Sequence, residues 1–289
     1  ADYIREKKPD SIVVHGDRVE ALAGAIVGSL NNIIVWHVEG GEVSGTVDEL
    51  IRHSVTKLTH VHFVANKTAQ KRLIQMGEKK DNVYIIGSPD VDIMNSDSLP
   101  CIKQVKKHYN ITFENYSILI LHPVTTELDN ISYQVEVLIS QLVLSKRNYI
   151  VIYPNNDHGS NIIMNSYSKI QNLAEFKVFP SIRFESFLVL LKNADFIIGN
   201  SSVGVREASY FGVPAINVGT RQYFRVSCKT VLNVDFDNFQ IKKAIESVVS
   251  FPRDKSFNFG RGNSARKFIE VVSSENVQSL SPQKFFVDF

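Results

Sequence analysis

Short apolar runs recur along the chain, and segments with helical spacing of apolar residues separate them. The runs are apolar throughout instead of alternating with polar residues, which is typical of parallel strands buried on both faces. They predict strands at residues 11–14, 33–36, 61–65, 83–86, 117–121, 149–153, 176–179, 195–198 and 215–218. The helical patterns include residues 20–30, 49–57, 67–75, 184–192 and 203–210. Strands alternating with helices predict an α/β protein with doubly wound parallel sheets.

A polar stretch, residues 95–107 with Pro100, separates the first four predicted strands from the other five. We therefore expect an N-terminal domain over residues 1–95 and a second Rossmann-like domain over residues 107–262. A helical pattern within residues 264–289 is expected to pack back on the first domain. A Rossmann-type sheet commonly has about six strands, and this sequence opens on a helical pattern instead of a strand. We expect one or more N-terminal strands to be missing from it.

The composition argues against nucleic acid and membranes as partners, but it does not identify a binding partner. Hydrophobic residues make up 44% and charged residues 21% of the 289 residues, and the formal net charge is +2. This balance gives no case for nucleic acid or a membrane surface as a partner, and no apolar run approaches the roughly 18 residues that cross a bilayer. Cys101 and Cys228 lack the spacing of a metal or redox motif, which indicates a reducing compartment, the cytoplasm. The four histidines between residues 37 and 62 lack metal-ligand spacing, so we expect no metal.

Polar and titratable side chains follow five of the predicted strands. They lie in residues 15–18, 37–42, 122–126, 154–157 and 199–202. In an open parallel sheet, ligands bind beyond the carboxyl ends of the strands. The sequence therefore predicts a functional cleft, which we expect between the two domains.

Three carboxylates are candidates for acid and base chemistry. Asp17 and Glu39 follow adjacent predicted strands, and Asp48 immediately precedes a predicted helix. Asp48 has an alternative role as a helix cap. Glu39 precedes the Gly40-Gly41 pair, has no evident local structural role, and its glycine neighbours suggest a close backbone approach. Carboxylates gathered in a closed cleft raise one another's pKa values, which suits general acid and base catalysis.

The second domain offers candidates for binding an anion. His122 is either a proton carrier or hydrogen-bond donor to a leaving phosphate, or a packed histidine before Pro123. Ser201 and Ser202 stand between a strand and a predicted helix, where backbone N–H groups and the helix dipole favour phosphate. The alternative is a plain helix cap. Glu207 either accepts hydrogen bonds from a ribose or is a solvated helix carboxylate.

These segments resemble those of the hydrolysing UDP-N-acetylglucosamine 2-epimerases, the enzymes of bacterial sialic-acid and capsule biosynthesis. The resemblance covers essentially the whole chain in order. It rests on VHGDRVEALAGA, HVEGGEVSGTVDELIRH, HPVTTE, YPNND, FPSIRFESFLVLL, GNSSVGVREA and GVPAINVGTRQ. The closing SPQKFFVDF is particularly similar to the capsule enzymes.

The resemblance implies a GT-B fold, with two Rossmann-like domains and UDP-GlcNAc in the cleft between them. It implies conversion of UDP-GlcNAc and water to N-acetylmannosamine (ManNAc) and UDP, the first step toward CMP-sialic acid. UDP is eliminated to leave 2-acetamidoglucal, which is then hydrated. No cofactor is implied, and the assembly is a homodimer or a dimer of dimers. Family members begin with a strand and a turn containing Gly and Arg that reaches the phosphates, which this sequence lacks.

The resemblance also implies a role for each matching residue. The acid and base group comprises Asp17, Glu39 and Asp48, with the division of labour among them left open, and His122 stabilises the leaving UDP. The other expected substrate contacts are Ser201 and Ser202 to the diphosphate, Glu207 to the ribose, Phe179 and Ile182 to the uracil, and Arg18, Asn155 and Arg221 to phosphate or sugar. A surface position without function is the alternative for Arg221.

Other functions remain open at this stage. A related hydrolysing enzyme acts on a UDP-diacetamido-trideoxy sugar, and a non-hydrolysing epimerase returns UDP-ManNAc. A GT-B glycosyltransferase that uses UDP-GlcNAc would need an acceptor site. A non-catalytic UDP-sugar binder has no reason to keep Asp17, Glu39, Asp48 and His122 together. Release of free ManNAc distinguishes the hydrolysing epimerase from the glycosyltransferase and the binder.

Overall fold

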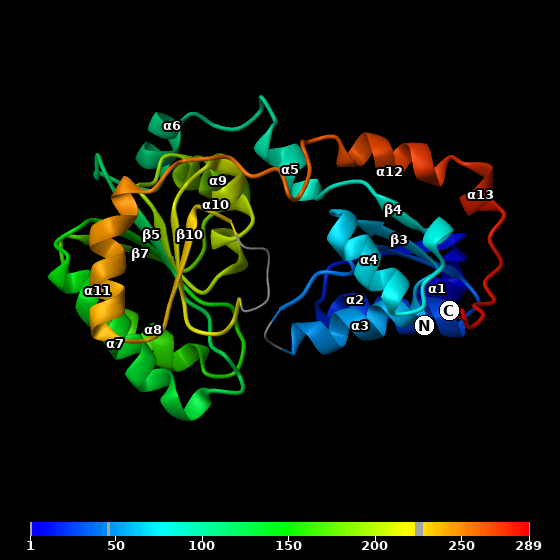
Figure 1. Ribbon diagram of the computed structural model, residues 1–289, viewed down its shortest axis with the longest axis horizontal. Coiled ribbons are helices and arrows are strands. Elements are labelled where there is room, and N and C mark those ends of the chain that lie inside the picture. The colour runs from blue at the N-terminus through cyan, green and yellow to red at the C-terminus, as the bar shows by residue number, and fades with distance from the viewer. Residues whose placement is uncertain (1, 45–46, 223–227, 289) are drawn as a thin grey trace. The chain divides into compact units, whose positions relative to one another are not determined.

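The computed structural model describes residues 2–44, 47–222 and 228–288. Contacts divide the chain into two compact units, one of residues 1–95 and 257–289 and the other of residues 96–256 (Figure 1). Each unit contains a sheet whose described strands all pair in parallel. The predicted α/β class with two parallel sheets is therefore confirmed. Among the described residues, no helix is both long and apolar enough to cross a bilayer.

The first unit is built on a four-stranded sheet in the order β1-β2-β3-β4. The strands are β1 (Ser11–His15), β2 (Ile34–Val38), β3 (Val61–Val64) and β4 (Val83–Ile85). The helices of this part are α1 (Asp2–Lys7), α2 (Val19–Leu30), α3 (Asp48–Leu58), α4 (Lys67–Gln75) and α5 (Pro89–Met94). All four residues of β3 are buried, as its unbroken apolar pattern predicts.

The C-terminal segment completes the core of the first unit. It forms α12 (Ser264–Val272) and α13 (Glu275–Gln278), drawn in red in Figure 1. The ring of Phe268 in α12 lies 4.6 Å from that of Phe63 and 6.1 Å from that of Trp36, measured between centroids. The Asp92 carboxylate accepts hydrogen bonds from the first two backbone N–H groups of α12, at 2.9 and 2.8 Å. These contacts fix the helix on the sheet.

The second unit contains a six-stranded sheet in the order β10-β9-β8-β5-β6-β7. Numbered from β5, this is the order 3-2-1-4-5-6 of dinucleotide-binding sheets, which reverses direction between β5 and β8. The strands are β5 (Ser117–Ile120), β6 (Tyr149–Ile152), β7 (Phe176–Phe179), β8 (Ile197–Gly199), β9 (Ala215–Val218) and β10 (Val231–Val234). The helices are α6 (Ile102–His108), α7 (Ile131–Leu144), α8 (Ser160–Ser168), α9 (Phe184–Lys192), α10 (Glu207–Phe211) and α11 (Asn238–Ser247).

Two elements of the second unit differ from the prediction. Strand β10 was not predicted, because it lies at the sheet edge with partly exposed side chains and contains Asn233. The predicted helix over residues 203–210 is confirmed only in its second half: the 3-10 turn Ser202–Gly204 precedes the short helix α10, Glu207–Phe211. Gly204 packs against Ala215 of β9, where an added Cβ would lie 3.4 Å from the alanine Cβ. A poor helix former held against the sheet interrupts the helix there.

A buried carboxylate links α3, β3 and the C-terminal segment of the first unit. Glu78 is 4% exposed and accepts hydrogen bonds from Lys57 Nζ at 2.7 Å, Lys284 Nζ at 2.6 Å and His62 Nε2 at 3.0 Å. Burial alone would raise the pKa of Glu78. The hydrogen bond from His62 and the charge of Lys284 outweigh burial and lower that pKa to about 2.

This lowered pKa predicts an acid-dependent loss of stability. The folded-state pKa lies below the ordinary value of 4.5, so the ionised Glu78 stabilises the fold above that pH and the gain is lost as pH falls toward 2. At pH 7, Glu78→Gln is expected to lower the free energy of unfolding by about 2 kcal/mol, because the partly exposed Lys57 and Lys284 lose a charged hydrogen-bond partner. Urea unfolding at pH 7, 5, 4 and 3 should show the gap from wild type narrowing with acid. A constant gap would contradict this role.

Candidate active site

The first unit brings two predicted carboxylates to one edge of its sheet. Asp17 follows β1 and Glu39 follows β2, and the register of this parallel pair places His15 opposite Val38. Pairing continues past the strands, since the Gly16 N–H donates to the Val38 carbonyl at 2.9 Å. The buried His37 ring adds a 2.8 Å hydrogen bond from Nε2 to the Gly16 carbonyl. The turn that carries Asp17 is thus fixed against β2.

Glu39 is held in an uncommon backbone conformation with its carboxylate fixed. Its φ is +67°, in the left-handed region that residues other than glycine seldom adopt. One carboxylate oxygen accepts from Ser88 Oγ at 2.5 Å, and the other lies 3.1 Å from His15 Nε2. The adjacent Gly41 passes so close to α4 that an added Cβ would lie 2.4 Å from the Ala69 carbonyl oxygen. The close approach expected of the glycine pair is therefore to α4.

Helix α3 carries Asp48 and a buried arginine that pairs with Asp17. Arg52 is 1% exposed, forms an ion pair with the Asp17 carboxylate, and donates to the Glu42 carbonyl at 3.0 Å. It lies four residues after Asp48, the half-buried first residue of α3, so both side chains lie on one face of that helix. An acidic side chain in the first turn interacts favourably with the helix dipole. One helix thus carries one carboxylate and positions a second.

Arg52 was not among the residues predicted from the sequence. Its ion pair with Asp17 spans 35 residues of sequence, and the helical pattern alone gives no partner for a basic residue. The available signal was its four-residue spacing from Asp48, which places the guanidinium on the helix face that carries a predicted carboxylate.

Replacing Arg52 is expected to impair both stability and turnover. Arg52→Met leaves Asp17 without its counter-charge, so we expect turnover to fall about 10²-fold through misplacement of the carboxylate. The free energy of unfolding should fall by about 3 kcal/mol. Arg52→Lys keeps the positive charge but loses the second terminal nitrogen. Its turnover and its free energy of unfolding should lie between those of wild type and Arg52→Met. Arg5→Met, on the exposed surface of α1, is the control for kcat and urea unfolding. Wild-type turnover in Arg52→Met would rule out the positioning role.

In the second unit, several predicted site residues lie where the sheet reverses direction. His122 follows β5, and residues 200–202 follow β8, the strand paired with β5. Asn200 is 1% exposed and joins the two strand ends: its Oδ1 accepts from the His122 N–H at 2.7 Å, and its Nδ2 donates to the His122 carbonyl at 2.8 Å. A Cβ on Gly199 would lie 1.9 Å from the Ile120 carbonyl oxygen, so only glycine permits this approach. Ligands bind at such switch points.

The His122 ring is set to donate a hydrogen bond. Its Nδ1 accepts from the backbone N–H of Asn155 at 3.0 Å, so the proton of the neutral ring resides on Nε2. Burial, followed by the positive charge of Arg221, lowers the pKa of His122 to about 3. At neutral pH the ring is therefore an uncharged Nε2–H donor. This geometry favours the hydrogen-bond donor over the proton carrier considered from the sequence.

Among the other residues predicted for the second unit, Asn155 and Arg221 interact with His122. Arg221 donates to the Asn200 carbonyl at 3.4 Å and is partly buried, so it does not occupy an open surface position. Ser201 and Ser202 are also partly buried, and Ser201 Oγ accepts from the Val203 N–H at 3.4 Å. Glu207 begins α10 and is 6% exposed, so the alternative of a solvated carboxylate is wrong. The Asn155 side chain hydrogen bonds to Asp157.

The remaining predicted contacts are less defined. The Phe179 carbonyl already accepts from the Tyr153 N–H at 3.0 Å, and its ring packs edge-on against Tyr109. Ile182 is partly buried and packs, like Phe179 and Tyr109, against one hydrophobic core cluster of the second unit. Arg18 is 64% exposed and lies 3.6 Å from the Glu20 carboxylate. Within the described ranges, no group of three or more His, Cys, Asp or Glu side chains is arranged to hold a metal ion.

Known proteins resemble this chain over most of its length. The family model of UDP-N-acetylglucosamine 2-epimerases matches residues 1–273. The chain is 48% identical to the UDP-N-acetylglucosamine 2-epimerase of Neisseria meningitidis, over 98% of this chain and 76% of the relative. It is 31% identical to a hydrolysing UDP-N,N'-diacetylbacillosamine 2-epimerase of Legionella pneumophila, over 94% of this chain and 73% of the relative. It is 33% identical to polysialic acid biosynthesis protein P7 of Escherichia coli, over 95% and 67%.

Solved structures share the fold. The UDP-GlcNAc 2-epimerase of Methanocaldococcus jannaschii, in complex with UDP-GlcNAc and UDP, superposes with a TM-score of 0.80 at 23% identity, over 94% of this chain and 78% of that one. A UDP-GlcNAc 2-epimerase from N. meningitidis bound to UDP-GlcNAc gives 0.79 at 18% identity, over the same shares. The expected GT-B class is confirmed. Together with the family match and the ordered motifs, these findings show that the chain belongs to the UDP-N-acetylglucosamine 2-epimerase family.

Proposed function

We propose that the chain is a hydrolysing 2-epimerase that converts UDP-GlcNAc and water to ManNAc and UDP. The observation that carries the proposal is the set of three carboxylates in the first unit, two of them held by Arg52, Ser88 and His15. Similarity to the N. meningitidis epimerase at 48% identity supports the sugar. The hydrolysing relative and the polysialic acid protein support the hydrolytic outcome and a place early in sialic-acid or capsule biosynthesis.

The first stage is elimination of UDP. One of Asp17, Glu39 and Asp48 takes the proton from carbon 2, the carbon 1–oxygen bond breaks, and its electron pair leaves with UDP. The double bond of 2-acetamidoglucal forms between carbons 1 and 2. The proton on carbon 2 is weakly acidic, so a base in fixed geometry and stabilisation of the departing charge are both required. The fixed Glu39 carboxylate meets the demand for geometry.

The second stage is hydration of the double bond. A carboxylate takes a proton from water as hydroxide adds to carbon 1, and a protonated carboxylate returns a proton to carbon 2 on the opposite face. The result is ManNAc with inverted configuration at carbon 2. Two groups in opposite protonation states are needed, which accounts for several carboxylates at one site.

We propose that the second unit binds UDP. The neutral His122 donates from Nε2 to the leaving diphosphate, where a donor aimed at developing charge is most effective. Ser201 and Ser202 add hydrogen bonds to the diphosphate, and Arg221 adds positive charge near His122. Glu207 accepts from the ribose hydroxyls, and the segment from Phe179 to Ile182 contacts the uracil. Asn155 supplies a further contact to phosphate or sugar, and Arg18 of the first unit another.

The nearest alternative is the same reaction on a UDP-diacetamido-trideoxy sugar. Two relatives at 31% and 32% identity carry names of this type, whereas the 48% relative is named for UDP-N-acetylglucosamine. The higher identity favours UDP-GlcNAc.

We further propose that the enzyme works in the cytoplasm, as a homodimer or a dimer of dimers. Sedimentation velocity tests the assembly, and a monomer would refute it.

Product analysis tests the proposed function. UDP-GlcNAc is incubated with the purified chain, and the products are separated by anion exchange and identified by mass and proton NMR. We expect free ManNAc and UDP in equal amounts, and slower turnover of the UDP-diacetamido sugar. Exclusive formation of UDP-ManNAc would refute the hydrolytic assignment. Faster turnover of the UDP-diacetamido sugar than of UDP-GlcNAc would instead assign the diacetamido sugar as the substrate.

A further inference from the structure

The C-terminal segment of the chain caps a helix that carries active-site residues. Lys284 Nζ donates to the carbonyls of Thr56 and Lys57, both at 3.2 Å, and of Thr59 at 2.8 Å. These carbonyls lie at and just beyond the end of α3, where the last backbone acceptors of a helix need partners from outside it; the Thr56 carbonyl also accepts from the Thr59 N–H at 3.2 Å. A lysine at a helix C-terminus also opposes the negative end of the dipole.

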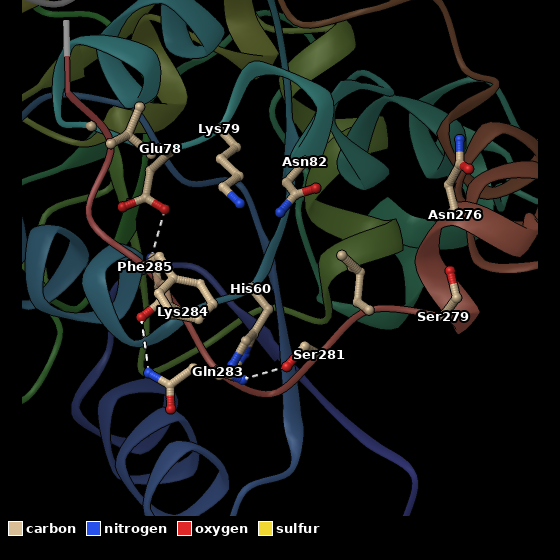
Figure 2. Close-up of a pocket in the computed structure, with 13 residues that line it drawn as sticks. His60, Glu78, Lys79, Asn82, Asn276, Ser279, Ser281, Gln283, Lys284 and Phe285 are labelled. Atoms are coloured by element: carbon tan, nitrogen blue, oxygen red, sulfur yellow. Dashed lines mark hydrogen bonds and ion pairs between the residues drawn. The ribbon is translucent and has the colours of Figure 1, made fainter.

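Lys284 is itself held in place from two sides. Its ammonium lies 2.6 Å from the buried Glu78 carboxylate, and the side chain is 29% exposed. Two residues earlier, the Pro282 carbonyl accepts from His60 Nε2 at 2.9 Å, while His60 Nδ1 accepts from the Val35 N–H at 3.0 Å. Figure 2 shows Lys284, Glu78 and His60 around one pocket. The segment is thereby fixed to the end of α3 and to β2.

Helix α3 links this attachment at its C-terminal end to candidate active-site residues at its start and middle. It spans only 11 residues, Asp48–Leu58, about 16 Å at 1.5 Å per residue. Asp48 begins it, and Arg52 holds Asp17 from its middle. A helix of three turns moves as a unit, so a tilt at its capped end displaces Asp48 and the guanidinium that fixes Asp17.

We propose that Lys284 is a positioning residue for the epimerase reaction: by capping α3, it sets the placement of Asp48 and of the Arg52–Asp17 pair. The inference rests on the proposed function, because it matters only if these carboxylates carry out the chemistry. It adds a residue far along the chain, in the C-terminal segment, to the determinants of turnover.

The pocket beside Lys284 provides a specific test. Its volume is about 220 Å³, and its lining includes His60, Glu78, Lys79 and Lys284. Removing the Lys284 side chain connects this space to the end of α3. A small alkylammonium ion, ethylammonium, fits the vacated position and can donate to the same carbonyls and to Glu78.

The variant Lys284→Ala is expected to lower kcat about 10- to 100-fold, with the KM for UDP-GlcNAc within about threefold of wild type. Ethylammonium at millimolar concentration should restore part of kcat in this variant and leave wild type unchanged. Lys79→Ala is the matched control, because it removes an exposed lysine from the same pocket but leaves the Lys284 cap, and its kcat should stay near wild type.

Lys284→Ala also leaves Glu78 with one fewer cation, which lowers stability. The double variant Lys284→Ala/Glu78→Gln avoids the unpaired charge and should still lose kcat. Wild-type kcat in either variant overturns the inference while leaving the proposed function intact. An equal loss in Lys79→Ala also overturns it, because loss of any lysine beside this pocket would then explain the defect. No recovery of kcat with ethylammonium overturns it as well, because a cation returned to the end of α3 would then not affect turnover. Failure of the proposed function has a different signature, the absence of ManNAc from wild type.

Discussion

Each of the variants Asp17→Asn, Glu39→Gln and Asp48→Asn is expected to reduce turnover of UDP-GlcNAc by about 10²- to 10⁴-fold. An amide of the same shape can neither accept the carbon 2 proton nor return one. The affinity for UDP should change little, because we assign UDP binding to residues of the second unit. These are the largest effects we expect from single substitutions.

The three variants should differ in stability. Asp17→Asn leaves Arg52, 1% exposed, without its counter-charge, and we expect a loss of about 3 kcal/mol in the free energy of unfolding. Glu39→Gln keeps an acceptor for Ser88 Oγ and should unfold nearly as wild type does. Asp48 begins α3, where loss of a favourable charge costs about 0.5 kcal/mol.

Steady-state kcat, titration calorimetry with UDP and urea unfolding together check this prediction. Asp10→Asn is the control, since this exposed carboxylate precedes β1, at the opposite end of the strand from Asp17. A variant with near-normal turnover would exclude that residue from the catalytic group. Release of 2-acetamidoglucal would show that a variant still eliminates UDP, and so assign the missing carboxylate to hydration.

His122→Ala is expected to reduce turnover by about 10²- to 10³-fold through loss of a donor to the departing UDP. His122→Gln offers an amide N–H and should retain more activity than alanine. His108→Ala, an exposed histidine of α6, is the control. If His122→Ala turned over at the wild-type rate, the ring would be a packing residue only.

The lowered pKa of His122 adds a pH test of its role. The folded-state value of about 3 lies below the ordinary 6.5, so the neutral ring is favoured in the fold. Its contribution to stability is complete above pH 6.5 and is lost as pH falls toward 3. The ring stays neutral between pH 6 and 8, so wild type and His122→Gln should show parallel pH profiles of kcat there. An inflection near pH 6.5 in wild type that the variant lacks would mean that the ring titrates during turnover.

The sheets could be predicted from the sequence because their strands are buried on both faces. Strand β3 is a continuous apolar run of four buried residues, and the sequence identifies it within one residue. Strand β10 was missed because an edge strand need not be apolar throughout. The helix over residues 203–210 was predicted from spacing alone, which carries no information on the contact between Gly204 and β9.

The candidate site was predictable to the extent that topology determines it. Carboxyl ends of parallel strands meet at one edge, so Asp17 with Glu39, and His122 with residues 200–202, followed from order along the chain. The contacts that hold these residues in place could not be predicted from that order. Arg52 reaches Asp17 across 35 residues, and Asn200 reaches His122 across 78. Such pairs depend on how helices and loops pack, which local patterns do not specify.

The central claim is elimination and hydration at carbon 2, and proton NMR of the reaction in deuterated water tests it most directly. We predict that all ManNAc released carries deuterium at carbon 2, because the substrate proton is lost to a carboxylate and replaced from solvent. UDP should appear in an equal amount. ManNAc that retains its carbon 2 proton, or a product still attached to UDP, would contradict the account.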